Sequence, residues 1–320
     1  MDRVRLGLIG AGGMANRVHY PSLAEWDDVE MVALCDLDEG KLNETAEKFG
    51  IANRFTDYRT MLDEVEVDAV YILMPPHHLF DLVIDVIGRG KHVLIEKPPG
   101  VTSEQTRQMA NAAEKAGVVS MVAFNRRYIP LLNLARKRVL DRGPMIQCVS
   151  TFYKDHRGNG PYYNGAIDIL SCDAVHAVDT LRWMGGNVEQ VSSDVQSRAG
   201  ACYDNMFNAL VRFENGGVGV LLTNWNVGGR RHTFEMHGEG ISAFVDPDDR
   251  ALIYEDNATE PETITTQEAS ESEEFRFYSG FAAENRHFID CVKAGKETGS
   301  TLRDAVKTME LVDWIYTMAW

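Results

Sequence analysis

The residues best suited to chemistry lie in two places along the chain. Lys97 follows the short apolar run His92–Ile95, with one glutamate between them. Farther on, Asp173, His176 and Asp179 recur at intervals of three, and side chains three apart share one face of a helix. An ammonium group stabilises negative charge that develops on oxygen, and histidine gains or loses a proton near neutral pH. These residues are therefore the first candidates for a functional site.

A glycine-rich segment near the start of the chain has the pattern of a dinucleotide site. It follows the apolar run Val4–Ile9 and opens a helical pattern, and the next apolar run ends in Asp36. Glycines allow a tight turn and a close approach to a pyrophosphate, which the amides of a helix N-terminus stabilise, while the acid reaches the ribose hydroxyls. The predicted cofactor residues of this segment are Gly10, Ala11, Gly12, Gly13, Met14, Ala15 and Asp36.

Asp36 also bears on the choice between NAD and NADP. A carboxylate accepts a hydrogen bond from a free 2′-hydroxyl, whereas it repels a 2′-phosphate. The four residues after Asp36 include no arginine, and Lys41 is the nearest cation. We therefore expect NAD in preference to NADP. The alternative interpretation of the whole segment is a glycine turn in a nucleotide-free, flavodoxin-like domain.

The elements that must position these residues differ between the two parts of the chain. Up to residue 123, apolar strands alternate with helical patterns, which predicts a Rossmann domain with a doubly wound parallel sheet. From residue 124 to 320 we expect an α+β domain with a large, mostly antiparallel open sheet, its period-2 runs joined by turns such as Asn215-Gly216. The expected strands are 4–9, 31–35, 69–73, 92–95, 118–124, 145–153, 188–198, 206–213, 218–226, 232–237 and 242–245, and the expected helices are 41–49, 79–87, 103–116, 131–140, 167–184, 281–293 and 302–316. Residues 154–165 and 257–274 are expected to be loops.

Bulk composition narrows the class of protein. The chain has 320 residues, 44% hydrophobic and 25% charged, which suits two globular domains with cores of their own. Its formal net charge of −16 disfavours nucleic acid and anionic membranes as partners. The five cysteines form no CxxC pair and fit reduced thiols, and no leader or membrane-spanning pattern opens the chain. We therefore expect a cytoplasmic protein that binds neither nucleic acid nor a membrane.

The chain resembles the family of glucose–fructose oxidoreductase and inositol dehydrogenase, called Gfo/Idh/MocA. The segment 90–99, Gly-Lys-His-Val-Leu-Ile-Glu-Lys-Pro-Pro, carries the most specific part of this resemblance. Further matching segments run over nearly the whole chain: Met74-Pro75-Pro76-His77, Phe124-Asn125-Arg126-Arg127-Tyr128, His176 with Asp179 and Leu181-Arg182-Trp183, and the Phe213–Gly216 hairpin. The resemblance implies an NAD(P)-dependent enzyme of sugars or cyclitols, with no metal.

The resemblance also implies roles for individual residues. Lys97 would hold the reacting hydroxyl where nicotinamide and substrate meet, and His176 would accept its proton. Family members typically carry an aspartate four residues before that histidine, but here this position is Cys172. Three accounts stay open: Asp173 takes over the catalytic role, Lys97 and His176 suffice, or the chemistry differs from simple alcohol oxidation. Asp179 is either a site residue or a structural acid.

The remaining candidates surround these groups. Besides the glycine segment, the cofactor candidates are Met74, Pro75, His77, Glu96, Lys97 and Asn125. The substrate candidates are Lys97, Arg126, Arg127, Tyr128, Lys154, His156, Tyr163, Cys172, His176 and Asp179. The arginine pair suits a polyol, a carboxylate or a sulfonate, although one arginine can instead pair with an acid of the scaffold. Residues 154–165 supply either specificity or only a solvated loop.

The combined interpretation is an NAD-dependent oxidoreductase that moves a hydride between nicotinamide and a secondary hydroxyl of a sugar, cyclitol or sugar derivative. The first alternative is a redox-neutral enzyme that cleaves glycosides by transient oxidation and elimination. The second is a non-catalytic sensor of nucleotide or sugar, with Cys172 as a sign of lost chemistry. We also expect a homo-oligomer, a dimer or a tetramer, because this family often pairs the exposed faces of its open sheets.

Overall fold

The computed structural model describes residues 2–157 and 159–319 and contains two compact units. The first unit comprises Met1–Phe124 and Phe281–Val306, and the second comprises Asn125–Gly280 and Lys307–Trp320. The predicted boundary after residue 123 lies one residue before the end of the first stretch. Residues 281–306, which we assigned to the C-terminal domain, group with the N-terminal part instead.

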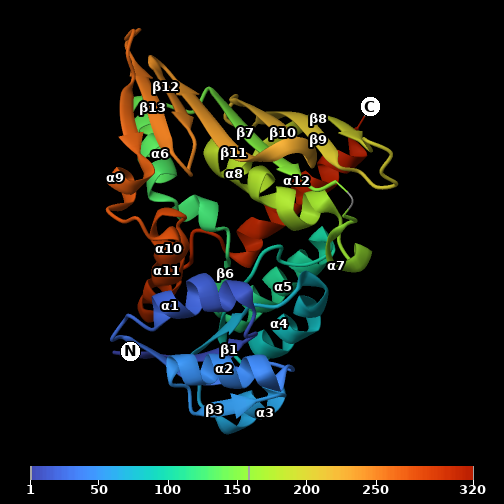
Figure 1. Ribbon diagram of the computed structural model, residues 1–320, viewed down its shortest axis with the longest axis vertical. Helices are drawn as coiled ribbons and strands as arrows, with labels where there is room; N and C mark the ends of the chain where they lie inside the picture. The colour runs from blue at the N-terminus through green and yellow to red at the C-terminus, as the bar shows by residue number, and fades with distance from the viewer. Residues whose placement is uncertain (1, 158, 320) are drawn as a thin grey trace. The chain divides into compact units, whose positions relative to one another are not determined.

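The first unit is built on a six-stranded parallel sheet in the order β3-β2-β1-β4-β5-β6 (Figure 1). Its strands are β1 (Val4–Ile9), β2 (Val29–Cys35), β3 (Asn53–Phe55), β4 (Ala69–Ile72), β5 (His92–Ile95) and β6 (Ser120–Val122). β1, β4 and β5 are almost completely buried, which explains why they appear in the sequence as continuous apolar runs. The strand order reverses between β1 and β4, the point where open sheets of this kind bind ligands.

Two helices of the first unit begin and end at ordinary capping signals. Asp38 and Thr102 accept backbone N–H groups at the N-termini of α2 (Glu39–Phe49) and α5 (Ser103–Ala116), and glycines in the left-handed region end both helices. The other helices are η1 (Ala15–His19), α1 (Tyr20–Leu23), α3 (Tyr58–Glu64), η2 (Pro76–His78), α4 (Leu79–Gly88) and α11 (Phe281–Ala294). Among the described residues, no helix of either unit combines the length and apolar character needed to span a membrane.

The second unit contains an eight-stranded sheet in the order β14-β13-β12-β11-β7-β10-β9-β8. All neighbours in it are antiparallel except β7 and β10, which run parallel. Its strands are β7 (Gln147–Asp155), β8 (Val188–Gln196), β9 (Met206–Phe213), β10 (Val218–Asn224), β11 (Asn226–Gly238), β12 (Ile241–Val245), β13 (Arg250–Glu255) and β14 (Glu262–Thr265).

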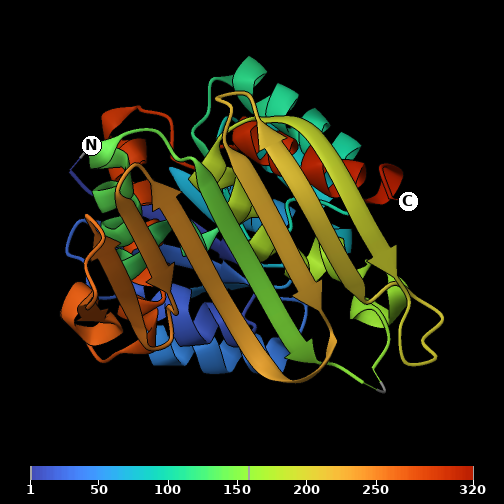
Figure 2. The ribbon, with the colours of Figure 1, turned by 90° about the horizontal axis from the view of Figure 1, so that it is seen from above.

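Helices cover one face of this sheet. α8 (Val175–Gly185) packs on β7 and β10, and α6 (Pro130–Arg142) packs on β11, β12 and β13. In the part of the chain that the structure describes, no helix of this unit covers the other face, onto which Figure 2 looks. The remaining helices are η3 (Asn125–Tyr128), α7 (Tyr162–Gly165), η4 (Leu170–Ala174), α9 (Thr266–Ser270), α10 (Phe275–Tyr278) and α12 (Leu302–Thr317), whose residues from Lys307 onward belong to this unit.

The predicted fold class is confirmed: a parallel Rossmann sheet and a large, mostly antiparallel open sheet. Several elements differ from the prediction in detail. The expected helix 167–184 is a π-helical turn, η4, followed by α8, and the expected loop 257–274 contains β14 and α9. β3, α3 and β13 were not predicted, because β3 is short and exposed and the segments around the other two carry many charged residues.

Gly185 at the end of α8 fixes how closely this helix approaches the sheet. A Cβ atom on Gly185 would lie 2.0 Å from the ring of Phe213 on β9. We expect Gly185→Ala to destabilise the protein by about 1–3 kcal/mol, because the ring or the helix must shift to make room. Thermal unfolding measures this loss as a lower Tm.

The matched control is Gly88→Ala at the end of α4, where an added Cβ meets nothing within 4 Å. Alanine favours the helix there, so the Tm of Gly88→Ala should equal that of the wild type or rise slightly. Equal Tm values for the two variants would contradict the close approach at Gly185.

Candidate active site

The glycine-rich loop has the shape that a dinucleotide needs. Gly10 has a φ of +106°, and a Cβ there would lie 2.5 Å from the carbonyl oxygen of Leu73. Only glycine suits this position. By contrast, Cβ atoms built on Gly12 or Gly13 would meet nothing within 4 Å, so this part of the backbone is open to an approaching ligand. The helix that starts here continues through η1, with Ala15 buried at its base.

Asp36 lies beside this loop at the end of β2. One carboxylate oxygen accepts the backbone N–H of Ala11 at 2.7 Å, and the other accepts that of Asp38 at 2.8 Å. An ionised carboxylate has about four lone-pair sites, so both oxygens keep acceptor capacity for ribose hydroxyls. The open glycine backbone, the helix N-terminus and the fixed acid together fit NAD.

The other cofactor candidates of the first unit follow β4 and β5. Met74 and Pro75 are half-buried and precede η2, whereas His77 is exposed, with its ring centroid 4.0 Å from that of His78. Partial desolvation and the neighbouring imidazole lower the pKa of His77. Met14 is 41% exposed, as a residue beside a bound cofactor can be.

Glu96 and Lys97 lie where β5 ends. The N–H of Glu96 donates to the carbonyl of Ile72 at 3.1 Å, which extends the parallel ladder by one residue. The Glu96 carboxylate accepts the N–H of Lys97 at 3.0 Å, and the Lys97 residue is half-buried. The carboxyl edge of the sheet thus presents an ammonium group on a short, fixed turn.

In the second unit, η3 brings an arginine to His176. Nη1 of Arg126 lies 3.0 Å from Nε2 of His176, and the His176 residue is 5% exposed. Because arginine has no acceptor, Nε2 must carry the lone pair and the neutral ring carries its proton on Nδ1. His176 is therefore held in the protonation state of a base. Nη1 of Arg126 also donates to Oδ1 of Asn125 at 2.7 Å.

Arg127 and Asp179 form a buried ion pair next to this contact. Nε and Nη2 of Arg127 donate to the two carboxylate oxygens of Asp179 at 2.8 and 2.6 Å. Oγ1 of Thr308 donates to the same carboxylate at 2.8 Å. Of the two arginines considered for the substrate, Arg127 pairs with an acid of the scaffold, and Asp179 is that acid.

Asp173 lies in η4 and faces a different set of partners. Its Oδ2 accepts the hydroxyl of Tyr162 at 2.6 Å and is also hydrogen-bonded by Nζ of Lys154. Cys172, the residue at the family's aspartate position, is buried, and its N–H donates to the carbonyl of Asp168 at 3.0 Å. The structure thus places Asp173 in a lysine–carboxylate–tyrosine cluster.

Aromatic residues that were not among the main candidates complete this cluster. Trp225 donates its indole N–H to the Tyr162 oxygen at 3.3 Å. Phe152 stacks on the buried His232 with centroids 4.2 Å apart, and Nζ of Lys154 lies 5.2 Å from the centre of the Phe152 ring. The strand period could have indicated that Phe152 and Lys154 share a face, but not that β11 supplies His232.

Among the remaining predicted residues, His156 contacts the cluster: its ring stacks on that of Tyr162 with centroids 5.2 Å apart, and its backbone N–H donates to the carbonyl of Trp225 at 2.9 Å. Tyr163 is 47% exposed and has a φ of +52°, so it is the neighbouring Tyr162 that reaches Asp173. Nε2 of His156 lies 3.2 Å from the carbonyl oxygen of Gly160, within its own loop. Tyr128 is half-buried in η3. Asn125 was expected at the cofactor, and in the second unit its amide group also donates to the carbonyl of Ser279 at 2.8 Å.

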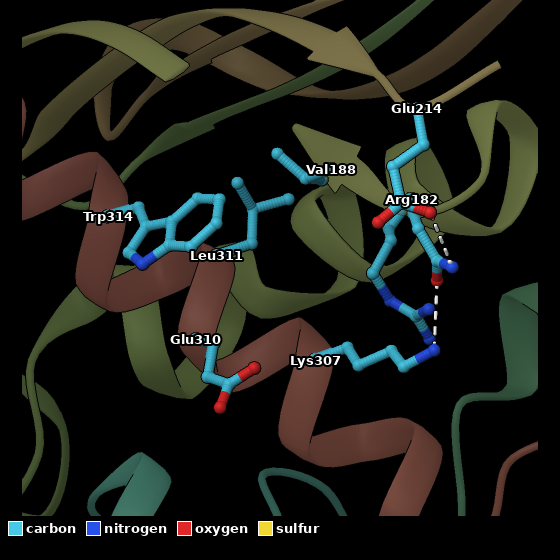
Figure 3. A pocket seen from close by; sticks show the side chains of 8 residues that line it. Arg182, Val188, Glu214, Lys307, Glu310, Leu311 and Trp314 are labelled. Atoms are coloured by element: carbon cyan, nitrogen blue, oxygen red, sulfur yellow. Dashed lines mark hydrogen bonds between the residues drawn. The ribbon is translucent and has the colours of Figure 1, made fainter. Parts of the chain in front are cut away.

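The second unit also contains a cavity of about 180 Å³ (Figure 3). It is lined by Arg182 at the end of α8 and by residues of α12. Asn187, which also lines it, accepts from Nζ of Lys307 at 2.9 Å and donates to Glu214 at 3.0 Å. Asn187, Lys307 and Glu214 thus bond to one another, whereas Arg182 donates to Thr308, a residue outside the lining.

Comparison with known proteins identifies the family. Residues 4–124 match a sequence model described as "Oxidoreductase family, NAD-binding Rossmann fold", and residues 150–243 match the GFO/IDH/MocA C-terminal domain. The chain belongs to the Gfo/Idh/MocA family of NAD-binding oxidoreductases. The predicted membership, enzyme class and cofactor are thereby confirmed.

Individual relatives resemble the chain over most of its length but at low sequence identity. The chain is 26% identical to levoglucosan dehydrogenase of Pseudarthrobacter phenanthrenivorans over 76% of this chain and 74% of that protein. It is 27% identical to D-glucoside 3-dehydrogenase of Escherichia coli over 84% and 83% of the two chains. A structure of levoglucosan dehydrogenase with NADH and levoglucosan superposes with a TM-score of 0.87 at 22% identity, covering 99% and 97% of the chains, which supports the fold.

Asp36 offers a test of the cofactor site. We expect Asp36→Ser to raise the Kd for NADH about tenfold, because an ionised acceptor of hydrogen bonds is lost. The Kd for NADPH should fall, since the carboxylate no longer repels a 2′-phosphate. Titration of bound-cofactor fluorescence measures both values.

Asp38→Ser is the matched control, because Asp38 is the exposed cap of α2 and serine keeps that cap. Its two Kd values should match those of the wild type. An unchanged preference for NADH over NADPH in Asp36→Ser would show that Asp36 does not bind the ribose hydroxyls.

Proposed function

We propose that this chain transfers a hydride between NAD(H) and a secondary hydroxyl of a sugar, cyclitol or sugar derivative. The observation that carries the proposal is the contact of Arg126 with His176, which keeps Nε2 of a buried histidine free of a proton. Membership of an NAD-binding oxidoreductase family supports the same reaction class. The roles of individual residues are part of the proposal.

Each residue has a defined task in this reaction. His176 accepts the hydroxyl proton at Nε2 and returns it in the reverse direction. The Lys97 ammonium donates to the reacting oxygen and stabilises the negative charge that develops on it. When bound, NAD supplies the acceptor for the hydride. Gly12 and Gly13 would hold NAD through their open backbone, and Asp36 would hold it through the ribose hydroxyls.

The names of relatives narrow the proposed substrate. Levoglucosan dehydrogenase, D-glucoside 3-dehydrogenase and myo-inositol 2-dehydrogenase are named for an anhydro sugar, a glycoside and a cyclitol. We therefore place glycosides and anhydro sugars first in a substrate panel, with inositols and sugar acids next. Such substrates present several neighbouring hydroxyls, which suit the donors Arg126 and Lys154.

Lys97→Met tests the proposed role of the ammonium group. With the best substrate of the panel, kcat should fall by about 10²–10³-fold, because the variant lacks the donor to the reacting oxygen. NADH formation followed by its absorbance gives the rate, and NADH titration shows whether the cofactor still binds.

Lys91→Met is the control, since Lys91 precedes β5 and its ammonium donates to the carbonyl of Val67. It should keep the wild-type kcat. An unchanged kcat in Lys97→Met would remove Lys97 from the mechanism. No turnover with any substrate, together with intact NADH binding, would favour a non-catalytic sensor.

One observation favours a second candidate, the redox-neutral cleavage of glycosides. Elimination needs an additional acid–base group, and the hydrogen-bonded set of Lys154, Asp173 and Tyr162 supplies one. The Tyr162 hydroxyl donates its proton to Asp173, and burial with the charge of Asp173 raises the pKa of that hydroxyl. In a glycoside-cleaving reaction, a leaving group of stronger basicity would take a proton from this set.

Tyr162→Phe distinguishes the two candidates. For the glycosidase, release of an aryl aglycone should fall at least about 10²-fold, because the variant lacks the proton donor. For the dehydrogenase, NADH formation should change only a few-fold. Tyr153→Phe, at a half-buried position on the other face of β7, is the control and should behave as the wild type in both assays. Equal aglycone release by both variants would exclude Tyr162 as the acid.

We further propose a cytoplasmic homo-oligomer that binds neither nucleic acid nor a membrane. The five cysteines are free, which suits a reducing compartment. Leu210 on β9 is 55% exposed beside a shallow hollow of about 240 Å³ formed by β8, β9 and β10, and a second copy could cover it. A monomer mass in light scattering would count against the oligomer.

A further inference from the structure

His19 is a completely buried histidine in the first unit, and its two ring nitrogens face two oxygen atoms. Nδ1 lies 3.0 Å from Oδ1 of Asn285 on α11, and Nε2 lies 3.1 Å from Oε1 of Glu96. The rings of Tyr71 and Phe281 lie edge-on to the imidazole, with centroids 6.2 and 6.0 Å away. Glu284 of α11, which is also completely buried, lies close enough to Tyr71 for its charge to act on that tyrosine. Exclusion of water strengthens each polar contact of His19.

The orientation of the Asn285 amide settles the role of Nδ1. Its nitrogen, Nδ2, donates to the carbonyl of Phe281 at 2.7 Å, so the atom that faces His19 is the amide oxygen. A carbonyl oxygen only accepts hydrogen bonds, and Nδ1 must therefore carry a proton.

Nε2 faces the carboxyl group of Glu96. Burial alone raises the pKa of Glu96, but the hydrogen bond and charge of His19, with the charge of Lys97, bring that pKa below its usual value. The second oxygen of Glu96 accepts the N–H of Lys97 at 3.0 Å. With Glu96 ionised, Nε2 donates to Oε1, and the imidazolium form of His19 is part of the proposal that follows.

We propose that His19 is a positioning residue for Lys97: as an imidazolium it fixes the Glu96 carboxylate, which in turn fixes the backbone of Lys97. This inference rests on the proposed function for the catalytic role of Lys97. His19 is the last residue of η1, the helical turn that follows the glycine loop. The cofactor-binding helix and the turn that bears Lys97 are thus joined by one ion pair.

A charged pair is an unusual choice for this task. Taking two charges out of water is costly, and packed apolar side chains often stabilise a core equally well. Glu96, however, must direct its second oxygen at one N–H group. A charged donor holds the orientation of a carboxylate more strongly than a neutral one. The pair therefore serves the geometry at Lys97.

The first measurement is the protonation state of His19. Nitrogen NMR of protein labelled with ¹⁵N-histidine, near neutral pH, distinguishes imidazolium from either neutral tautomer. The His19 signal is assigned as the one that His19→Gln removes. Two protonated ring nitrogens are expected, and a neutral His19 ring would overturn the inference.

The second measurement follows Lys97 without a substrate. Hydrogen–deuterium exchange of the peptide that contains Lys97 reports whether its N–H stays bonded to Glu96. We expect at least about tenfold faster exchange at Lys97 in His19→Gln, because a neutral amide holds Glu96 less firmly. His92→Gln, a change at a half-buried histidine that starts β5, should leave this exchange as in the wild type. No change in His19→Gln would overturn the inference.

Kinetics supply the third measurement. His19→Gln should lower kcat about 10–100-fold and leave the Kd for NADH within about threefold, as expected when a reacting group is misplaced. A loss of NADH affinity with unchanged kcat would contradict a role at Lys97. Should His19→Gln fail to fold, Asn285→Leu removes the acceptor of Nδ1 and is expected to shift exchange and kcat in the same direction.

These measurements separate the inference from the proposed function. If Lys97→Met keeps full activity, the proposed function fails, while the NMR and exchange results still decide whether His19 positions the backbone of Lys97. If Lys97→Met is inactive and neither exchange nor kcat responds in His19→Gln, the proposed function stands and the inference falls.

Discussion

The register of the parallel sheet is the constraint on which the first unit depends. Ile9 pairs with both Cys35 and Ile72, and Ile72 pairs with Ile95, so four strands end at one level. The ladder continues one residue beyond, through the N–H groups of Gly10, Leu73 and Glu96. The glycine loop, Asp36 and the turn that bears Lys97 start from this common edge. A shift of one residue in any strand would separate them and turn its side chains to the other face.

The second unit depends on a buried charge pair instead. Arg127 and Asp179 join η3 to α8 through two hydrogen bonds, and Thr308 adds a third to the carboxylate. Such a pair repays the cost of desolvation only when its geometry is this complete. Because Arg126 precedes Arg127 in the same short turn, the pair also determines where Arg126 meets His176 on α8. Arg182 donates to Thr308 at 3.0 Å and extends the network along α8.

The helices and strands of both units could largely be predicted from the sequence. The side-chain contacts that join these elements could be predicted much less well. β1, β4 and β5 could be identified because buried parallel strands are continuous apolar runs, and the glycine loop because its spacing reflects backbone geometry. β14 was missed because its residues are exposed or half-buried and its segment is rich in threonine and glutamate. The contacts of His19 could not be predicted from the sequence, because its partners lie 77 and 266 residues away along the chain. The choice between Tyr162 and Tyr163 depended on positive φ values that neither residue type signals.

In the proposed chemistry, Arg126 affects both the position and the protonation state of His176. A guanidinium cannot lose its proton in a protein, so while it donates to Nε2 it keeps His176 neutral. A substrate hydroxyl that reaches Nε2 must displace or share this contact, which brings Arg126 next to the reacting oxygen. Once His176 has taken the proton, two cations face each other at the observed 3.0 Å. At the effective dielectric constant typical of proteins, their repulsion is about 5 kcal/mol before relaxation. The arrangement therefore favours passing the proton onward over storing it, and it restores the neutral base for the next turnover.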